Sequence, residues 1–547
     1  MAYPFDAPAF GSPSFNEEYR FGSAGWAGTQ GLRAAGLFAP EGPQIGYWGN
    51  KPLYLAGDAP MITVGGAGSG KLRDLLAFVV CRSPGQRMAV LDPRGELGAI
   101  SFHVHAAHGD FAYFWNPVGL CGLPRHRCNP LDILHMGSPT FHADCKFIAE
   151  GFIALSGGGN SQYFELRARE WLENIMKSRV EQFGGTSLPD LYRVVNSIQG
   201  DRQRWADQLE AMLKSRFEAV RRTAAEMLEK QQDTPKEFGA IMGEIYAHLN
   251  FLDDPVLLAS LEEPDFSLSA LTDPDQPCKI FFNIPAEFLS IWSPLVRLFF
   301  TVSILYKARR PEAPRVMLLV DEAGQLGRFE ALLRAFTYGR GAGVRPWAIF
   351  QDIGQIVRNF DRPALQGFLG SAQLRQFFGV RDYDTAQLVS DMLGTETLTY
   401  DDTLQQEGAR RQKWETMKAV LDGSDPFAAA YDYAHFQRGT EHRTKQARPL
   451  MTADEALAMP EDRQVLFISG KNLRPVYASK HPYFTRREMA GRYLANPYHP
   501  PIDSVPIATR FGTRRARVVT EAVPREFARF PQYQGGFWSY VEGFKPL

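Results

Sequence analysis

The chain has 547 residues, of which 44% are hydrophobic and 22% charged, and its formal net charge is −1 at pH 7. This length allows two or more domains with substantial cores. The balanced charge excludes a protein that coats nucleic acid with its whole surface, but it does not exclude a local basic groove or channel. The five cysteines are irregularly spaced and lack paired CxxC motifs, which indicates reduced thiols in a cytosolic compartment.

The first 50 residues are rich in Gly, Pro, Ala and aromatic residues, so we expect an irregular N-terminal arm over residues 1–50. Residues 1–21 contain acidic residues and several prolines and have no apolar run, so we expect no secretory signal peptide there.

A strand, a glycine-rich loop and a helix follow the arm. Met61–Val64 is a short apolar strand, Lys71–Val80 is a helix, and Met88–Leu91 is a second buried strand. This order predicts the start of a parallel α/β sheet over residues 51–135. Cys121, His126 and Cys128 are spaced like the beginning of a metal site, but no second ligand pair follows, so we favour ordinary packing.

The middle of the chain, residues 136–270, is predicted to be helical. Phe164–Phe183 is amphipathic, and apolar residues recur every three or four positions in Arg202–Gln232 and Phe238–Leu252. These stripes are typical of packing between helices and do not imply a cofactor. We therefore expect an all-α domain inserted into the sheet domain.

The sheet resumes over residues 271–490. Its expected strands are Lys279–Ile284, Val316–Val320, Trp347–Phe350, Leu374–Val380 and Val465–Ser469. The most hydrophobic stretch, Leu289–Tyr306, contains Pro294 and Arg297 and lies between two of these strands, so a buried crossover helix is favoured over a membrane span.

Two later segments show no regular pattern. Residues 401–449 are polar and are expected to form a mobile excursion. Residues 491–547 are rich in Pro, Arg and aromatic residues and are expected to form an irregular C-terminal tail. Within this tail, residues 510–529 hold six arginines and two glutamates, which makes them a candidate nucleic-acid contact as well as a candidate solvated surface.

The segment "VGGAGSGKLRDLLAF" has the spacing of a phosphate-binding loop between a strand and a helix. The expected nucleotide contacts are Gly65, Gly66, Ala67, Gly68, Ser69, Gly70, Lys71 and Leu72. Successive backbone N–H groups and the helix N-terminus attract phosphate, and Lys71 reaches the β- and γ-phosphates of ATP. Leu72 stands where a Ser or Thr hydroxyl normally ligates Mg²⁺, so the rate of hydrolysis is in doubt while ATPase activity is still expected.

The apolar strand before Asp321 and Glu322 supplies the partner of this loop. Asp321 is expected to bind Mg²⁺ through its coordination shell, and Glu322 is expected to orient and deprotonate the attacking water. Gln351, at another strand end, is expected either to sense the γ-phosphate or position water, or simply to cap a helix. Arg340, between two glycines, is either a solvated charge or a residue that stabilises the transferring phosphate across a subunit boundary.

These motifs resemble the type IV coupling proteins of the TraG/TraD family, the P-loop ATPases of conjugative DNA transfer. The similarity extends over "GSAGWAGTQGLRAAGL", "VLDPRGEL", "DEAGQLGRFEALLRAFTYGRGAGVRPWAIFQDIGQI", "FFGVRDYDTAQLVSDMLG" and "MPEDRQVLFISG". It implies a RecA-like motor domain with an inserted all-α domain, and a homo-hexamer with nucleotide at the subunit boundaries. Lys71, Asp321, Glu322, Gln351 and Arg340 match the family's site residues.

The resemblance also implies partners and a location. The expected cargo is single-stranded DNA, a relaxase–DNA complex or secreted proteins, handed to channel proteins of the inner membrane. Relatives usually begin with transmembrane helices, whereas only 21 residues precede Gly22 here. We therefore expect a cytoplasmic protein recruited to the membrane by partners. A nucleotide-binding adaptor without turnover is the alternative that Leu72 favours, and a small-molecule kinase is disfavoured because no lid pattern accompanies the loop.

Overall fold

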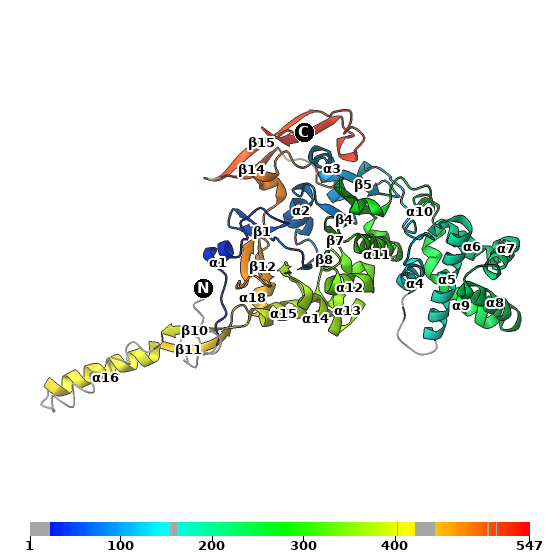
Figure 1. Cartoon of the computed structure of the whole chain (residues 1–547). Helices are drawn as coiled ribbons and strands as arrows, with labels where there is room; N and C mark the ends of the chain where they lie inside the picture. Colours follow the sequence, from blue (N-terminus) through cyan, green and yellow to red (C-terminus); the bar gives the residue numbers. More distant parts are fainter. Residues whose placement is uncertain are drawn as a thin grey trace. The chain divides into compact units, whose positions relative to one another are not determined.

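The computed structural model describes residues 22–153, 155, 161–401, 403–421, 443–499, 503–509 and 511–546 (Figure 1). These residues form two compact units. One unit draws on residues 1–35, 380–459 and 471–477, and the other on residues 36–379, 460–470 and 478–547.

A large mixed sheet organises the second unit. Across the part of the chain that the structure describes, its strands follow the order β2–β1–β13–β12–β9–β3–β8–β7–β4–β6–β5. Their bounds are β1 (Gln44–Trp48), β2 (Lys51–Tyr54), β3 (Met61–Gly65), β4 (Arg87–Asp92), β5 (Phe111–Trp115), β6 (Cys278–Asn283), β7 (Val316–Val320), β8 (Val344–Phe350), β9 (Leu374–Phe378), β12 (Arg463–Ile468) and β13 (Val476–Ser479). The strands from β9 to β5 run parallel, whereas β12 is antiparallel to β9.

The central strands are mostly apolar because both faces of the sheet are covered. Every residue of β3, β4, β6, β7 and β8 is buried. The predicted α/β fold is confirmed. β1 adds a strand where the sequence suggested an irregular arm, and β2 adds one just after it.

Helices connect the parallel strands. They are η2 (Leu72–Leu76) with α2 (Ala77–Cys81), α3 (Glu96–His108), α11 (Ser293–Arg309), α12 (Glu330–Tyr338), α13 (Ile353–Phe360) and α14 (Arg362–Ser371). The most hydrophobic segment forms the buried crossover helix α11, whose Phe299 ring stacks on Phe282 of β6 with centroids 4.7 Å apart. None of the helices in the described ranges is long and apolar enough to cross a membrane.

A helical segment separates β5 from β6 along the chain, as expected for an inserted all-α domain. It contains α4 (Phe141–Phe152), α5 (Ser161–Phe183), α6 (Leu188–Gly200), α7 (Arg202–Leu213), α8 (Glu218–Asp233), α9 (Pro235–Leu249) and α10 (Pro255–Ala259). The stretch predicted from Arg202 to Gln232 is two helices. The break comes at Ser215, whose hydroxyl accepts the Phe217 N–H at 3.1 Å and so offers the backbone a non-helical partner.

The other unit contains α1 (Thr29–Ala34), α15 (Tyr383–Leu393), α16 (Thr403–Leu421), α18 (Ala453–Leu457) and the ribbon of β10 (Thr395–Asp401) with β11 (Arg443–Pro449). The ribbon and α16 occupy much of the segment expected to be an unpatterned excursion, of which residues 402 and 422–442 lie outside the described ranges. The sequence analysis did not predict these two strands, because neither has the alternating apolar residues that mark a half-buried strand. Backbone pairing from Thr395↔Pro449 to Asp401↔Arg443 holds them together.

The C-terminal region is also more regular than expected. β14 (Ser504–Thr509), β15 (Gly512–Ala522) and β16 (Phe537–Val541) form an antiparallel three-stranded sheet where an irregular tail was predicted. Val505, Ile507 and Val541 form a small core under it. Only two alternating apolar residues mark β14, a signal too short to distinguish from a loop.

A buried ion pair joins β6 to the residue just before the edge strand β5. Lys279 of β6 bonds to Asp110, and both side chains are fully buried; Asp110 also accepts the Gly85 N–H at 3.0 Å. Burial lowers the pKa of Lys279, and Asp110 opposes this shift by stabilising the charged amine.

We expect Lys279→Met to lower the free energy of unfolding by about 3–5 kcal/mol, because it leaves the Asp110 carboxylate buried without a counter-charge. Lys279→Met/Asp110→Asn should recover most of the loss, because Asn keeps an acceptor for Gly85. Chemical denaturation followed by fluorescence measures both. A double variant no more stable than the single variant contradicts the assignment.

Candidate nucleotide-binding site

Three neighbouring parallel strands bring the predicted site residues to one edge of the sheet. β3 leads into the glycine loop, β7 ends just before Asp321, and β8 ends just before Gln351. β8 lies between β3 and β7 in the sheet. Because parallel strands end at the same edge, the loop, the acidic pair and the amide meet there, the usual place for a ligand in an α/β fold.

The loop has the backbone conformation that a phosphate cradle needs. Gly68 and Gly70 adopt positive φ angles of 71° and 83°, which glycine accepts without strain. The Gly66 N–H donates to the Gly379 carbonyl after β9 at 3.2 Å, which anchors the start of the loop. The chain then continues as a π-helical turn, Leu72–Leu76, before α2.

The carboxylate of Glu322 lies between a cation and an amide. Lys71 Nζ donates to its Oε1 at 2.9 Å, and Gln351 Nε2 donates to its Oε2 at 2.7 Å. The Lys71 side chain is 9% exposed and that of Glu322 is 23% exposed, so water reaches the carboxylate more easily than the amine. Residues separated by 251 and 29 positions in sequence thus form one hydrogen-bonded group.

An unusual backbone conformation aims Glu322 at its partners. Its φ of 53° lies in the left-handed region, which costs a residue with a Cβ about 1–2 kcal/mol. The Glu322 N–H donates to Asp321 Oδ1 at 3.0 Å, which compensates part of this strain. Strain of this kind is retained where the side-chain direction is needed.

Asp321 is suited to hold a cation. Burial, and then the neighbouring Glu322 charge, raises its pKa to about 7, so a divalent cation beside it would relieve an unfavourable charge. Mg²⁺ prefers oxygen ligands and commonly uses one or two carboxylates with phosphates and water. Leu72, half-buried in the first helical turn, has no ligand atom. Among the described residues no cluster of three His, Cys, Asp or Glu forms a metal cage of its own.

The residues present also fit a nucleotide phosphate. The buried Ser69 Oγ, inside the loop, has no hydrogen-bond partner among the described residues, and such orphaned polar atoms are uncommon. Together with the Lys71 amine, it offers a donor to an anionic group.

Arg340 does not join this group within its own chain. It lies in the turn before β8, its side chain is 67% exposed, and its Nε pairs with Asp58 Oδ1 at 2.9 Å. An ion pair this exposed is worth at most about 1 kcal/mol, so the arginine can leave it readily.

Two residues that the sequence analysis missed support the site. Gln355 Oε1 accepts the Gln351 N–H at 3.0 Å, and a Cβ at Gly324 would lie 2.1 Å from that oxygen, so only glycine fits there. The motif "QDIGQ" carries a local signal for this bond, because Asp352 caps α13 by accepting the Gln355 N–H at 2.8 Å and an Asp followed three residues later by Gln is typical of a helix start.

Lys480 is the second residue that the sequence analysis missed. Its buried side chain contacts the backbone of the phosphate loop. Its Nζ donates to the Ser69 carbonyl at 2.7 Å, lies 3.5 Å from Asp74 Oδ2, and sits 4.0 Å from the centre of the Phe378 ring. The side chain is 2% exposed, and burial lowers its pKa despite the charge of Asp74. No sequence signal connects it to a loop 411 positions away.

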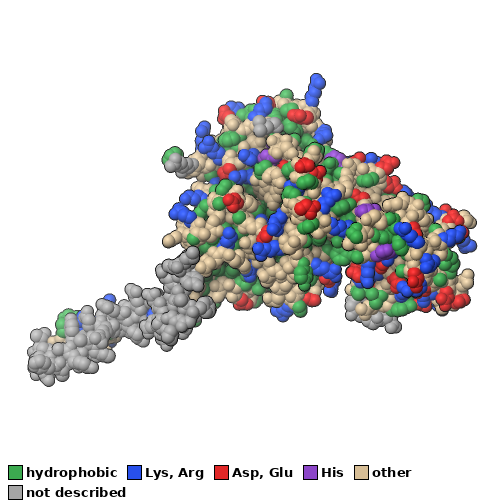
Figure 2. Space-filling model, viewed as in Figure 1, with side chains coloured by type: hydrophobic (Ala, Val, Ile, Leu, Met, Phe, Trp, Pro, Cys, Tyr) green, Lys and Arg blue, Asp and Glu red, His purple; other side chains and the backbone are tan. Residues whose placement is uncertain are grey.

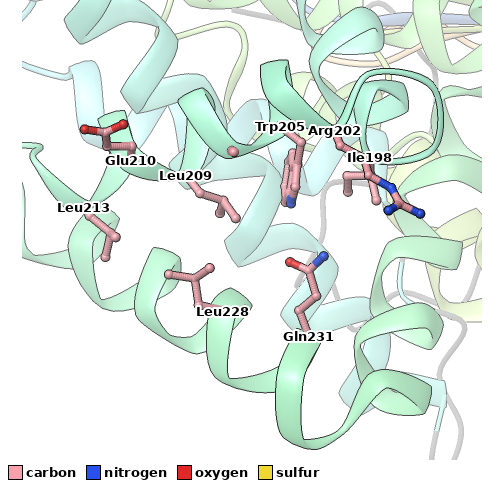
Figure 3. A pocket seen from close by; sticks show the side chains of 9 residues that line it. Ile198, Arg202, Trp205, Leu209, Glu210, Leu213, Leu228 and Gln231 are labelled. Atoms are coloured by element: carbon pink, nitrogen blue, oxygen red, sulfur yellow. The ribbon is translucent and has the colours of Figure 1, made fainter.

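A separate hollow lies in the helical segment. It has a volume of about 570 Å³, and in Figure 3 Trp205 and Leu209 of α7 face Leu228 of α8 across it. Arg202, Glu210 and Gln231 line its rim. It contains neither a glycine loop nor an acidic pair, so the nucleotide chemistry belongs to the sheet edge.

Comparison with known proteins agrees with this geometry. Residues 20–501 match the family model described as "Type IV secretory system Conjugative DNA transfer". The chain belongs to this family. It is 22% identical to the conjugal transfer protein TraG of Escherichia coli over 81% of this chain and 72% of that protein. It is 24% identical to the protein VirD4 of Agrobacterium fabrum (strain C58) over 70% of this chain and 58% of that protein.

Solved structures of a coupling protein share the fold of this family member. The bacterial conjugative coupling protein TrwB, in an unbound form, superposes with a TM-score of 0.57 at 17% identity, covering 82% of this chain and 92% of that one. TrwB in complex with ADP and Mg²⁺ gives the same score and identity, covering 82% and 91%. The RecA-like motor fold with an all-α domain is thereby confirmed.

We expect Lys480→Met to weaken ATP binding about tenfold, equivalent to ~1.4 kcal/mol, because the Ser69 carbonyl loses the donor that fixes the loop. Asp74 keeps its two hydrogen bonds from Arg73, so no buried charge is left unpaired. Calorimetric titration with ATP measures the effect. Lys307→Met is the matched control, because it removes another buried lysine, whose Nζ donates to the Arg310 carbonyl at 2.8 Å, outside the loop. An equal loss in both variants would refute a positioning role for Lys480.

Proposed function

We propose that this protein is an ATP-hydrolysing motor that recruits DNA or protein substrates and delivers them to a type IV secretion channel. The proposal rests on two hydrogen bonds, from Lys71 and from Gln351, that the Glu322 carboxylate accepts. A phosphate-binding lysine, a water-activating carboxylate and a polarising amide are the groups that phosphoryl transfer to water requires.

Each residue has a part that follows from its position. The loop and Lys71 hold the phosphates, and Asp321 holds Mg²⁺, which neutralises developing charge. When Lys71 turns to the phosphates, the Glu322 carboxylate is free to accept a hydrogen bond from the attacking water, with Gln351 fixing its orientation. Water attacks the γ-phosphorus, its proton passes to Glu322, and the bond to the β–γ bridging oxygen breaks to release ADP and phosphate.

Family membership supports the cargo and the assembly. Relatives named for conjugal transfer, and coupling-protein structures with ADP and Mg²⁺ or with analogues of ATP and GTP, favour ATP and Mg²⁺ as ligands here. We propose a relaxase–DNA complex, single-stranded DNA or secreted proteins as cargo. A homo-hexamer recruited to the cytoplasmic face of the inner membrane by channel proteins would bring Arg340 to a neighbouring site.

A nucleotide-binding adaptor without turnover is the second candidate. Leu72 favours it, because the first helical turn offers no hydroxyl to Mg²⁺. The intact Lys71, Glu322 and Gln351 group favours the motor, because binding alone requires no water-activating carboxylate.

Lys71→Ala should abolish detectable ATP binding, because Lys71 is the only charged side chain of the loop. Glu322→Gln should bind ATP but hydrolyse it about 10²–10⁴-fold more slowly, because it loses the general base. Calorimetry and phosphate release, with and without single-stranded DNA, distinguish the two.

Leu72→Thr should raise turnover if the missing hydroxyl limits Mg²⁺ placement.

Normal ATP binding by Lys71→Ala would remove the phosphate-loop assignment. Wild-type binding without any turnover would instead establish the adaptor.

Arg340→Ala should bind ATP almost normally and hydrolyse it poorly, because a residue that acts across a subunit boundary stabilises only the transferring phosphate. Such residues change turnover by about three to five orders of magnitude. Mixing Arg340→Ala with Glu322→Gln should restore part of the activity, since mixed rings contain sites with both residues intact. Mixed assemblies that form but stay inactive would disprove action in trans.

A further inference from the structure

A partly buried arginine of α11 lies beside the turn that follows Glu322. Figure 2 shows basic and acidic side chains interspersed over one face of the molecule, where water solvates them. Arg297 differs from these surface charges. Burial lowers its pKa to about 10, and within the described ranges no acidic side chain forms an ion pair with it. A cation placed there without a counter-charge lowers stability, so charge pairing is not what Arg297 contributes.

The hydrogen bonds of Arg297 join α11 to this turn. Its Nη1 donates to the Leu326 carbonyl at 2.7 Å and to Ser293 Oγ, within α11, at 3.2 Å. Leu326 is the last residue of η7 (Ala323–Leu326), a short 3-10 helix that begins directly after Glu322. A hydrogen bond from a charged donor is about twice as strong as one between neutral groups, so this bond fixes η7 to α11.

A second side chain holds η7 from another helix. Asn359 of α13 donates to the Gly324 carbonyl at 2.8 Å. At the start of the turn, the Gln325 N–H donates to the Glu322 carbonyl at 2.9 Å, which joins η7 to the residue before it. The position of Glu322 therefore follows from where α11 and α13 hold this short helix.

Glu322 depends on such support because its backbone is strained. Its φ of 53° is left-handed, and strain of this kind persists only where the surrounding contacts over-determine the conformation. A turn released from α11 would relax and move the carboxylate away from Gln351, whose Nε2 donates to it at 2.7 Å. A displacement of about 1 Å can reduce a catalytic rate about 100-fold.

We propose that Arg297 is a positioning residue for ATP hydrolysis. Through its bond to the Leu326 carbonyl it holds η7, and η7 holds Glu322 in the orientation that activates water. This inference rests on the proposed function, because it takes Glu322 as the general base. Arg297 acts through the turn and not through the nucleotide, so ATP binding by Lys71 and the phosphate loop is independent of it.

The first test examines the turn itself, by hydrogen–deuterium exchange of the full-length protein without nucleotide. Arg297→Met should speed exchange of the Gln325 amide about tenfold, because a hydrogen bond from a charged group stabilises the closed turn by at least about that factor. Arg297→Lys keeps a cationic donor and should restore part of the protection.

The matched control is Arg345→Met. Burial, as the largest cause, also lowers the pKa of Arg345 to about 10, but its guanidinium donates to the carbonyls of Ala59 and Leu55. It stands near the start of β8, at the other end of that strand from Gln351. The control should leave both the exchange of η7 and the kcat unchanged.

The second test measures steady-state hydrolysis of ATP. Arg297→Met should lower kcat about 10- to 100-fold and leave KM and the affinity for ATP unchanged within about twofold. In a Glu322→Gln background the same substitution should lower turnover little further, because the residue through which Arg297 acts has lost its role. An arginine that only stabilises the fold would lower turnover by the same factor in both backgrounds.

Four results would overturn the proposal: unchanged exchange of η7 in Arg297→Met, an equal change in Arg345→Met, an unchanged kcat, or an equal loss of turnover in both backgrounds. A wild type without turnover would contradict the proposed function and with it the catalytic role of Arg297. The exchange measurement needs neither ATP nor turnover, so it would still decide whether Arg297 holds η7.

Discussion

The parallel alignment of β3, β8 and β7 is the constraint on which the site depends. It brings the ends of three strands to one edge, where Glu322 accepts from Lys71 at 2.9 Å and from Gln351 at 2.7 Å. Strand pairing in the covered core determines those separations, because a slipped register would misplace close-packed side chains on both covered faces.

Two hydrogen bonds from outside the phosphate loop hold it in place, one at its start and one at Ser69. The Gly379 carbonyl anchors Gly66, and Lys480 donates to the carbonyl of Ser69. A loop fixed in this way keeps its shape without a ligand, which reduces the ordering cost of binding. This support also clarifies the effect of Leu72. The leucine removes a side-chain oxygen, while the backbone geometry of the loop and the carboxylate of Asp321 remain available.

Arg340 lies away from this edge and is suited to a partner. It forms an exposed pair with Asp58 and can be released at little cost. In the proposed assembly, Arg340 would complete a site in a neighbouring subunit.

The sequence alone determined the α/β fold, most central strands and the residues of the loop and acidic pair, because an apolar run followed by a polar motif is a local signal. The family was likewise recognised from linear motifs. Tertiary structure decided which groups meet: Lys480 donates to the Ser69 carbonyl across 411 positions, and Lys71 donates to Glu322 across 251. The β10–β11 ribbon and the C-terminal sheet were also missed, because cross-strand backbone pairing defines them and short or polar strands leave little hydrophobic periodicity.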